Sequence, residues 1–178
     1  MRQLKIAIVI ALAVILQSVL RLRWHFFVYI DLPLIVVVYF ALQRDPLQAM
    51  VVGVAAGLGT DALSAGGLLG AGGFTKTMVA YLLAALANRI NLDNPLVRIP
   101  ILASAALLDT TLYVLLHRML GQPSLIPFVE AAGKKIIATT IAGTVLLYVL
   151  DIIFSERARQ RRQFAFRRRV ARRSTRRR

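Results

Sequence analysis

Long apolar runs alternate with short polar breaks along most of the chain. A run of roughly 20 apolar residues is needed for a helix to cross a bilayer. The first run follows Arg2 and Lys5 and lacks a signal-peptide cleavage pattern after it, so we interpret it as a retained helix. The pattern predicts six helices, at about residues 6–20, 24–42, 46–63, 74–86, 97–120 and 129–154. The predicted fold class is therefore all-α, an integral membrane bundle of six transmembrane helices.

Polar residues at the breaks carry helix-end signals. Asp31 and Pro33 suit the first turn of the second helix, because Asp caps a helix start and Pro needs no N–H donor there. Pro46 follows a polar turn and begins the third helix, and the most polar internal loop spans residues 88–95. These breaks keep the apolar runs separate and support the count of six.

Composition agrees with a membrane protein. The chain is 58% hydrophobic with a mean hydropathy of +0.67, which is too apolar for a soluble domain of 178 residues. It has no cysteine, so disulfides and thiolate metal sites are excluded. We also predict no cofactor, because no ligand-binding motif is present.

Positive charge is concentrated at the C-terminal end. The net charge is +15, and residues 155–178 hold 12 arginines against one glutamate. We therefore divide the chain into a transmembrane domain, residues 1–154, and an Arg-rich tail, residues 155–178. Basic segments stay on the cytoplasmic side, so both termini of a six-helix bundle are expected there.

The tail has anionic lipid headgroups as its nearest polyanion, and we expect no nucleic acid as a partner. A specific acidic partner is the alternative. The candidate lipid contacts are Arg157, Arg161, Arg162, Arg167, Arg168 and Arg169.

A glycine-rich stretch, residues 49–76, stands out inside the apolar region and holds eight of the eleven glycines. Ala49, Gly53 and Gly57 are spaced by four and form one stripe of small residues on a helix. Such a stripe allows another helix to approach closely in lipid. It is a candidate surface either for an internal neighbour or for a partner helix.

Ionisable residues inside the membrane point to function by default, because they are costly there. Asp61 and Lys76 flank the glycines, and we predict that they form an ion pair across a turn. Asp109 is a candidate buried polar residue that bonds to a neighbouring helix. His117 shares a helix face with Asp109 and could join a proton relay, or its ring could extend to the interface. Lys135 is expected to reach the outer surface in the same way.

Catalytic patterns are missing from the sequence. It has no H-E-x-x-H or G-x-S-x-G motif, and the glycine-rich stretch lacks the G-K-[ST] of a phosphate loop. We therefore predict that the protein is not an enzyme.

Several short motifs resemble the MreD family of bacterial rod-shape proteins. They are the helix opened by Asp31-Leu32, the polar turn before Pro46-Leu47, and residues 57–64 (Gly-Leu-Gly-Thr-Asp-Ala-Leu-Ser) leading to further glycines. The resemblance covers about residues 1–154 and does not include the tail.

The resemblance implies a fold like that of the substrate-binding subunits of energy-coupling-factor vitamin transporters. It implies a non-catalytic scaffold of the cell-wall elongation complex in the bacterial inner membrane. The implied partner is MreC, with RodA, its transpeptidase and MreB nearby. Asp61 matches the family's acidic position after the glycines.

Two other functions are open from the sequence. A solute-binding subunit of a vitamin transporter is favoured by the implied fold and by Ala7-x-x-x-Ala11, which resembles the coupling motif of those subunits. An enzyme acting on a lipid-linked substrate is the third class, and no residues support it.

Overall fold

The computed structural model describes residues 2–23, 25–63, 70–89, 97–121 and 132–150. Among them there is no strand. The helices are α1 (Arg2–Arg23), the 3-10 helix η1 (His25–Tyr29), α2 (Leu32–Ala41), α3 (Pro46–Leu63), α4 (Ala71–Ala87), α5 (Arg98–Met119) and a last helix, Ala132–Leu150. The arginines named in the tail lie outside the described residues.

Four of these helices are long and apolar enough to cross a membrane. They are Gln3–Arg23, Pro46–Leu63, Arg98–Met119 and Ala132–Leu150. The prediction of an all-α membrane protein is confirmed at this level. α2 and α4 are shorter, with 10 and 17 residues. The chain divides into two compact units, Met1–Thr144 and Val145–Arg178, and the first contains α1 to α5.

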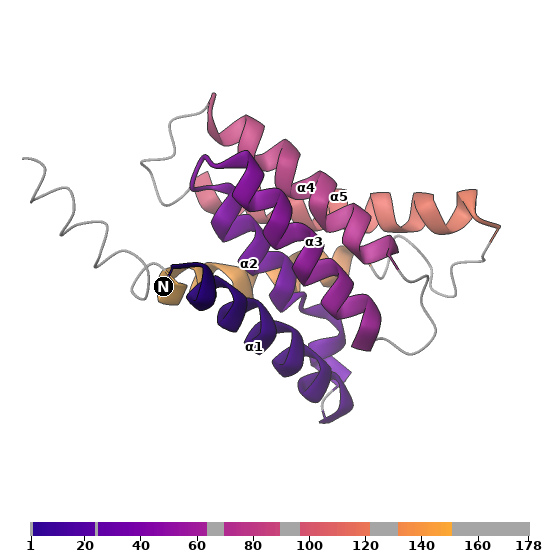
Figure 1. The fold of residues 1–178 in the computed structure, drawn as a ribbon. Coiled ribbons are helices and arrows are strands. Elements are labelled where there is room, and N and C mark those ends of the chain that lie inside the picture. Colours follow the sequence, from indigo (N-terminus) through magenta and orange to yellow (C-terminus); the bar gives the residue numbers. More distant parts are fainter. Residues whose placement is uncertain (1, 24, 64–69, 90–96, 122–131, 151–178) are drawn as a thin grey trace, which may run out of the picture. The chain divides into compact units, whose positions relative to one another are not determined.

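α2 lies inside the first unit and contacts α1, α3, α4 and α5 (Figure 1). Nine of its residues, Pro33 to Ala41, are buried, as expected for a helix that is apolar on all sides. The sequence predicted that Asp31 and Pro33 open this helix, and the structure confirms it, since α2 begins at Leu32 after the Asp31 cap. The apolar span counted from Trp24 to Leu42 is not one continuous α-helix, because the 3-10 helix η1 precedes α2.

The small-residue stripe of α3 packs against α4, and the two helices lie side by side in Figure 1. Ala49, Gly53 and Gly57 are buried. A methyl group on Gly53 would lie 2.9 Å from the carbonyl oxygen of Lys76, and one on Gly57 would collide with the backbone of Gly72. Of the two alternatives for the stripe, the structure shows the first, because Gly53 and Gly57 pack against α4 within the same chain.

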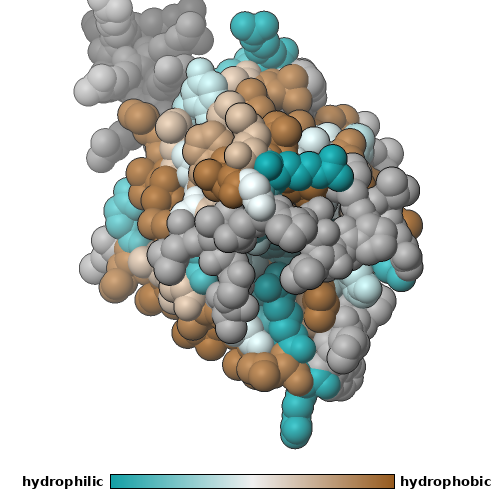
Figure 2. Space-filling view, turned by 90° about the vertical axis from the view of Figure 1, so that its right-hand side faces the viewer, coloured by the Kyte–Doolittle hydropathy of each residue, from teal (hydrophilic) through white to brown (hydrophobic). Residues whose placement is uncertain are grey.

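Large apolar side chains cover much of the exterior, as the brown areas of Figure 2 illustrate. On α1 they form the face opposite the core, where Leu4, Leu12 and Leu22 are 66%, 64% and 88% exposed. A soluble protein would bury such a face, whereas lipid solvates it without cost.

Candidate functional site: a buried ring of four charges

Two carboxylates and two ammonium groups meet inside the first unit and form a closed ring, here called the charge ring. Its members are Asp31, Lys76, Asp109 and Lys135, from the start of α2, from α4, from α5 and from the last helix. Each acid contacts both lysines, so charges alternate around the ring. Four elements are therefore joined at one point.

The distances divide the ring into two tight pairs. Lys76 Nζ lies 2.8 Å from Asp31 Oδ2, and Lys135 Nζ lies 2.8 Å from Asp109 Oδ2. The contacts between the pairs are longer, 3.4 Å from Lys76 to Asp109 and 3.2 Å from Lys135 to Asp31. The ring as a whole carries no net charge.

Burial makes this balance important. The side chains of Asp31, Lys76 and Asp109 are 6%, 5% and 3% exposed, and that of Lys135 is 23% exposed. A buried charge costs several kcal/mol to desolvate, and only good partners return that energy. Removing one member would leave an uncompensated charge in a low-dielectric region.

Hydroxyl groups complete the hydrogen bonding around the ring. Thr75 Oγ1 donates to Asp109 Oδ1 at 3.2 Å. Thr139 Oγ1 accepts from the backbone N–H of Asp31 at 3.3 Å and donates to the carbonyl of Tyr29 at 3.2 Å. The last helix is therefore attached to the start of α2 by Thr139 as well as by Lys135.

Gln17 of α1 holds the turn that presents Asp31. Its side chain is buried, its amide oxygen accepts from Leu32 N at 2.9 Å, and its amide nitrogen donates to the carbonyls of Phe27 and Ile30. We did not single it out from the sequence, where it is one polar residue in an apolar run. A lone glutamine in such a run is the signal that could have found it.

The ring lies well away from the end of the bundle at which α2 and α4 finish and α5 begins. On the last helix, Lys135 lies three positions after the start at Ala132. Asp31 is separated from the turn at Arg44 by α2, whose 10 residues span about 15 Å. Lys76 lies 11 positions before the end of α4 at Ala87, and Asp109 lies 11 positions after the start of α5 at Arg98. Both separations correspond to about 16 Å.

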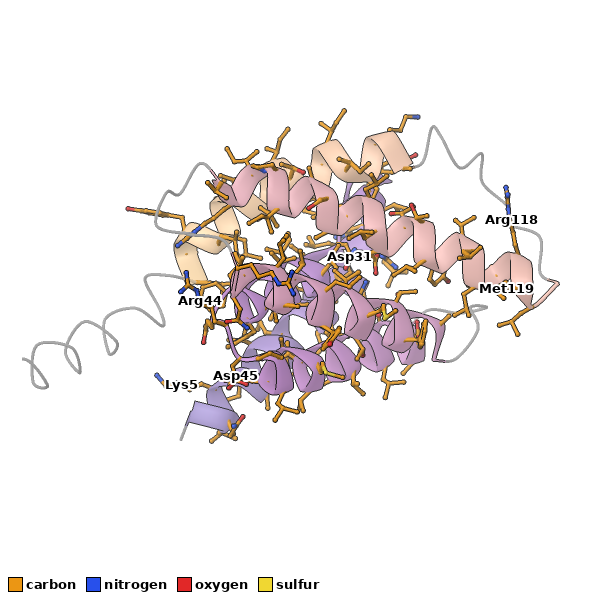
Figure 3. All side chains as sticks on the ribbon, turned by 90° about the horizontal axis from the view of Figure 1, so that it is seen from above. Lys5, Asp31, Arg44, Asp45, Arg118 and Met119 are labelled. Carbon is orange, nitrogen blue, oxygen red and sulfur yellow. The ribbon has the colours of Figure 1, made fainter. Side chains whose placement is uncertain are left out.

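Figure 3 shows the same placement. Asp31 lies between the end that holds Lys5, Arg44 and Asp45 and the end that holds Arg118 and Met119. The hydrocarbon core of a bilayer is about 30 Å thick, so a group about 16 Å from one end of helices that cross it would lie well inside the hydrocarbon.

The predicted pair of Asp61 with Lys76 is wrong. Lys76 binds Asp31 and Asp109 instead. Asp61 accepts hydrogen bonds from the backbone N–H groups of the first turn of α4, at Gly70 (2.9 Å), Gly72 (3.2 Å) and Gly73 (3.2 Å). The unpaired N–H groups and the dipole of a helix start attract a carboxylate, and this satisfies Asp61 without a lysine.

The glycines explain why Asp61 comes so close to α4. Any side-chain carbon at position 72 would strike the Asp61 carboxylate, so Gly72 is required there. Gly70, just before the helix, has φ of +100°, which favours glycine. The dense glycines thus serve a helix start and a close contact.

Asp109 is buried and bonded to neighbouring helices, as predicted. Lys135 does not reach the outer surface as we expected, because two carboxylates hold it. His117 stacks on Tyr113 with ring centroids 4.2 Å apart, and its Nδ1 lies 3.0 Å from the Tyr113 carbonyl oxygen. The described contacts therefore join His117 to the backbone of α5 and not to Asp109.

The arrangement is suited to holding helices together. Among the residues that the structure describes, no group of three or more His, Cys, Asp or Glu side chains could hold a metal ion. Both carboxylates of the ring are engaged by two lysines each.

Comparisons with protein families, with curated proteins and with solved structures found no match to this chain. The functional assignment accordingly depends on the residues and on the geometry of the ring.

Proposed function

We propose that the protein is a non-catalytic scaffold of the bacterial cell-wall elongation complex that binds the transmembrane helix of MreC and helps to maintain cell shape. The motifs that resemble MreD support this proposal. RodA, its transpeptidase and MreB are the further members of the assembly that the resemblance implies.

The charge ring is the observation that carries the proposal. A carrier of protons or ions needs a charged group that changes partner, whereas both acids here are bound by two lysines and by backbone or hydroxyl donors. A neutral joint between four elements, in which each acid and each lysine has two oppositely charged partners, favours a rigid body over a moving one. Rigidity suits a scaffold, because a preorganised surface loses little entropy on binding.

The proposed topology has six transmembrane segments in the bacterial inner membrane, with both termini cytoplasmic. α2 and α4 then cross the bilayer in spite of their length, because each packs against several other helices. Lys5 and Arg44 lie at one end of the unit and Arg118 at the other (Figure 3), as this topology requires. The Arg-rich tail would bind anionic lipid on the inner leaflet.

The partner surface lies elsewhere than on the α3 stripe, since α4 covers that stripe. A partner helix in lipid would use the apolar exterior. Without a hydrophobic drive between helices, packing and hydrogen bonds would carry the association.

Co-purification from native membranes tests the proposal. We expect tagged protein to retain MreC, with smaller amounts of RodA and its transpeptidase. A matched variant, Gly133→Ala, should retain the same amount, because a methyl group there meets nothing within 4 Å. Preparations that contain intact protein and never contain MreC would refute the scaffold role.

A transporter subunit is the second candidate, and one observation favours it. Ala7 and Ala11 are both exposed on the outer face of α1, where a coupling protein could contact them. If this role is correct, the same preparations should contain coupling-factor ATPases or a bound vitamin in place of MreC. The change Ala11→Leu should then release the ATPases and leave the vitamin bound.

A further inference from the structure

The charge ring connects two classes of helix. α1, α3, α5 and the last helix have 18 to 22 residues in their candidate spans, or about 27 to 33 Å, enough to cross a bilayer unaided. α2 and α4 measure about 15 and 25 Å. Each tight ion pair stays within one class. Asp31 and Lys76 belong to the short helices, and Asp109 and Lys135 belong to long ones.

All four long helices can cross the bilayer in either of two membrane arrangements. With six spans, α3 runs from the inner to the outer side. In the four-span arrangement, α2 and α4 both stay out of the bilayer centre and only the four long helices cross. Both termini then stay on the same side of the membrane, and α5 keeps its direction. Only α3 is reversed. Helix length alone does not choose between these arrangements.

We infer that the charge ring selects the six-span arrangement. The inference rests on the six-span topology proposed above. With four spans, Asp109 and Lys135 can keep each other neutral, while Asp31 and Lys76 remain in water. With six spans, Asp31 and Lys76 enter together, each compensating the other, and the contacts of 3.2 and 3.4 Å add them to the pair already present.

The ring and hydropathy predict opposite effects of the same substitution on the insertion of α4. Lys76→Met makes α4 more apolar, which by hydropathy alone would improve its insertion. In the ring, the same change leaves two carboxylates with one ammonium group, so the six-span form carries an unbalanced charge and the four-span form does not. An unbalanced charge at the bilayer centre shifts an insertion equilibrium by about a hundredfold.

Labelling of single cysteines can distinguish the two arrangements, and the chain has no cysteine of its own. Leu47 and Leu63 lie at opposite ends of α3 and are 78% and 54% exposed. Met119 at the end of α5 is 77% exposed and would lie on the outer side of the membrane in both arrangements. Each is changed to Cys in the full-length chain, and intact cells are treated with a membrane-impermeant maleimide.

In the parent chain we expect label at Leu63→Cys and Met119→Cys, and protection at Leu47→Cys. With Lys76→Met, label at Leu47→Cys should rise about tenfold or more and label at Leu63→Cys should fall, since the four-span form becomes favoured. Label at Met119→Cys should not change, which separates reversal of α3 from general leakage or unfolding. Asp31→Asn should act in the same direction and keeps the cap of α2.

The balanced double variant Asp31→Asn/Lys76→Met decides the matter. It leaves a neutral ring, so its labelling should return to that of the parent. If the single variants are degraded, the double should still accumulate in the membrane. Single variants that label like the parent, or a double as defective as either single, would overturn the inference.

Results that refute the role of the ring in topology can be distinguished from results that refute the proposed scaffold role. Parent chains labelled at Leu47→Cys and not at Leu63→Cys would overturn the six-span topology and this inference together. Retention of MreC is measured separately and does not depend on which way α3 runs.

Discussion

Asp31 has two roles that use different oxygens of one carboxylate. Oδ1 accepts the backbone N–H of Leu34 at 3.0 Å and caps α2, while Oδ2 binds Lys76 and Lys135. The capping role is local and readable from the order Asp-Leu-Pro. The second role joins residues up to 104 positions apart in the chain and depends on the packing of four elements.

Thermal unfolding in detergent should reveal this coupling. Lys76→Met alone should cost about 3 to 5 kcal/mol, because Asp31 and Asp109 then share one lysine. Adding Asp31→Asn should restore part of the loss, giving a strongly non-additive pair. Asp61→Asn with Lys76→Met is the matched control and should be additive, since Asp61 bonds to the start of α4. Coupling of Asp61 to Lys76 as strong as that of Asp31 would contradict the ring.

Contact between elements depends on whether backbones can approach. α3 and α4 come close enough that Gly57 faces the backbone of Gly72, with no room for a side chain. In lipid such close approach is a main source of helix association, since apolar side chains gain nothing by leaving lipid tails for each other. The pairing of α3 with α4 therefore depends on the absence of Cβ atoms at a few positions.

Two Gly→Ala substitutions should differ in their effect on stability. Gly57→Ala should destabilise the protein by about 1 to 3 kcal/mol, because α4 must shift to admit the methyl group. Gly133→Ala should be neutral or should stabilise by up to about 1 kcal/mol, because its methyl group meets open space in a helix. Melting temperatures in one detergent provide the comparison, and equal shifts would show that α3 and α4 are not in close contact.

The whole molecule combines a helical membrane domain with a strongly basic tail. Residues 1–154 carry a net charge of only +4, with 11 Lys or Arg against 7 Asp or Glu. The tail thus accounts for most of the net charge of +15. Its proposed role in membrane orientation is separate from the fold that the ring holds together.

A chain ending at residue 154 should keep the melting temperature of the full protein. A peptide of residues 155–178 should bind anionic vesicles with about 1 kcal/mol or less from each arginine, and should be released as salt is raised. Thermal melting of the shortened chain checks the first expectation, and centrifugation with vesicles at several salt concentrations checks the second. Binding to neutral vesicles that does not depend on salt would argue against an electrostatic role.

Periodic and local features of the chain were predictable from the sequence alone. Apolar runs predicted helices because the backbone must satisfy its own hydrogen bonds in lipid. Asp31 and Pro33 marked the start of α2, and the spacing of Ala49, Gly53 and Gly57 marked a close helix contact. Each of these depends on neighbours within a few residues, or on the solvent, and so needs no knowledge of the fold.

The partners of the charges were decided only by the tertiary structure. From the sequence, Lys76 was assigned to Asp61, the nearest acid across the glycines, and Lys135 to the outer interface. In the fold, the start of α4 supplies N–H groups that satisfy Asp61, which leaves Lys76 to Asp31 and Asp109. An ion pair forms where helix packing places opposite charges at the same depth, and separation along the chain does not specify that depth.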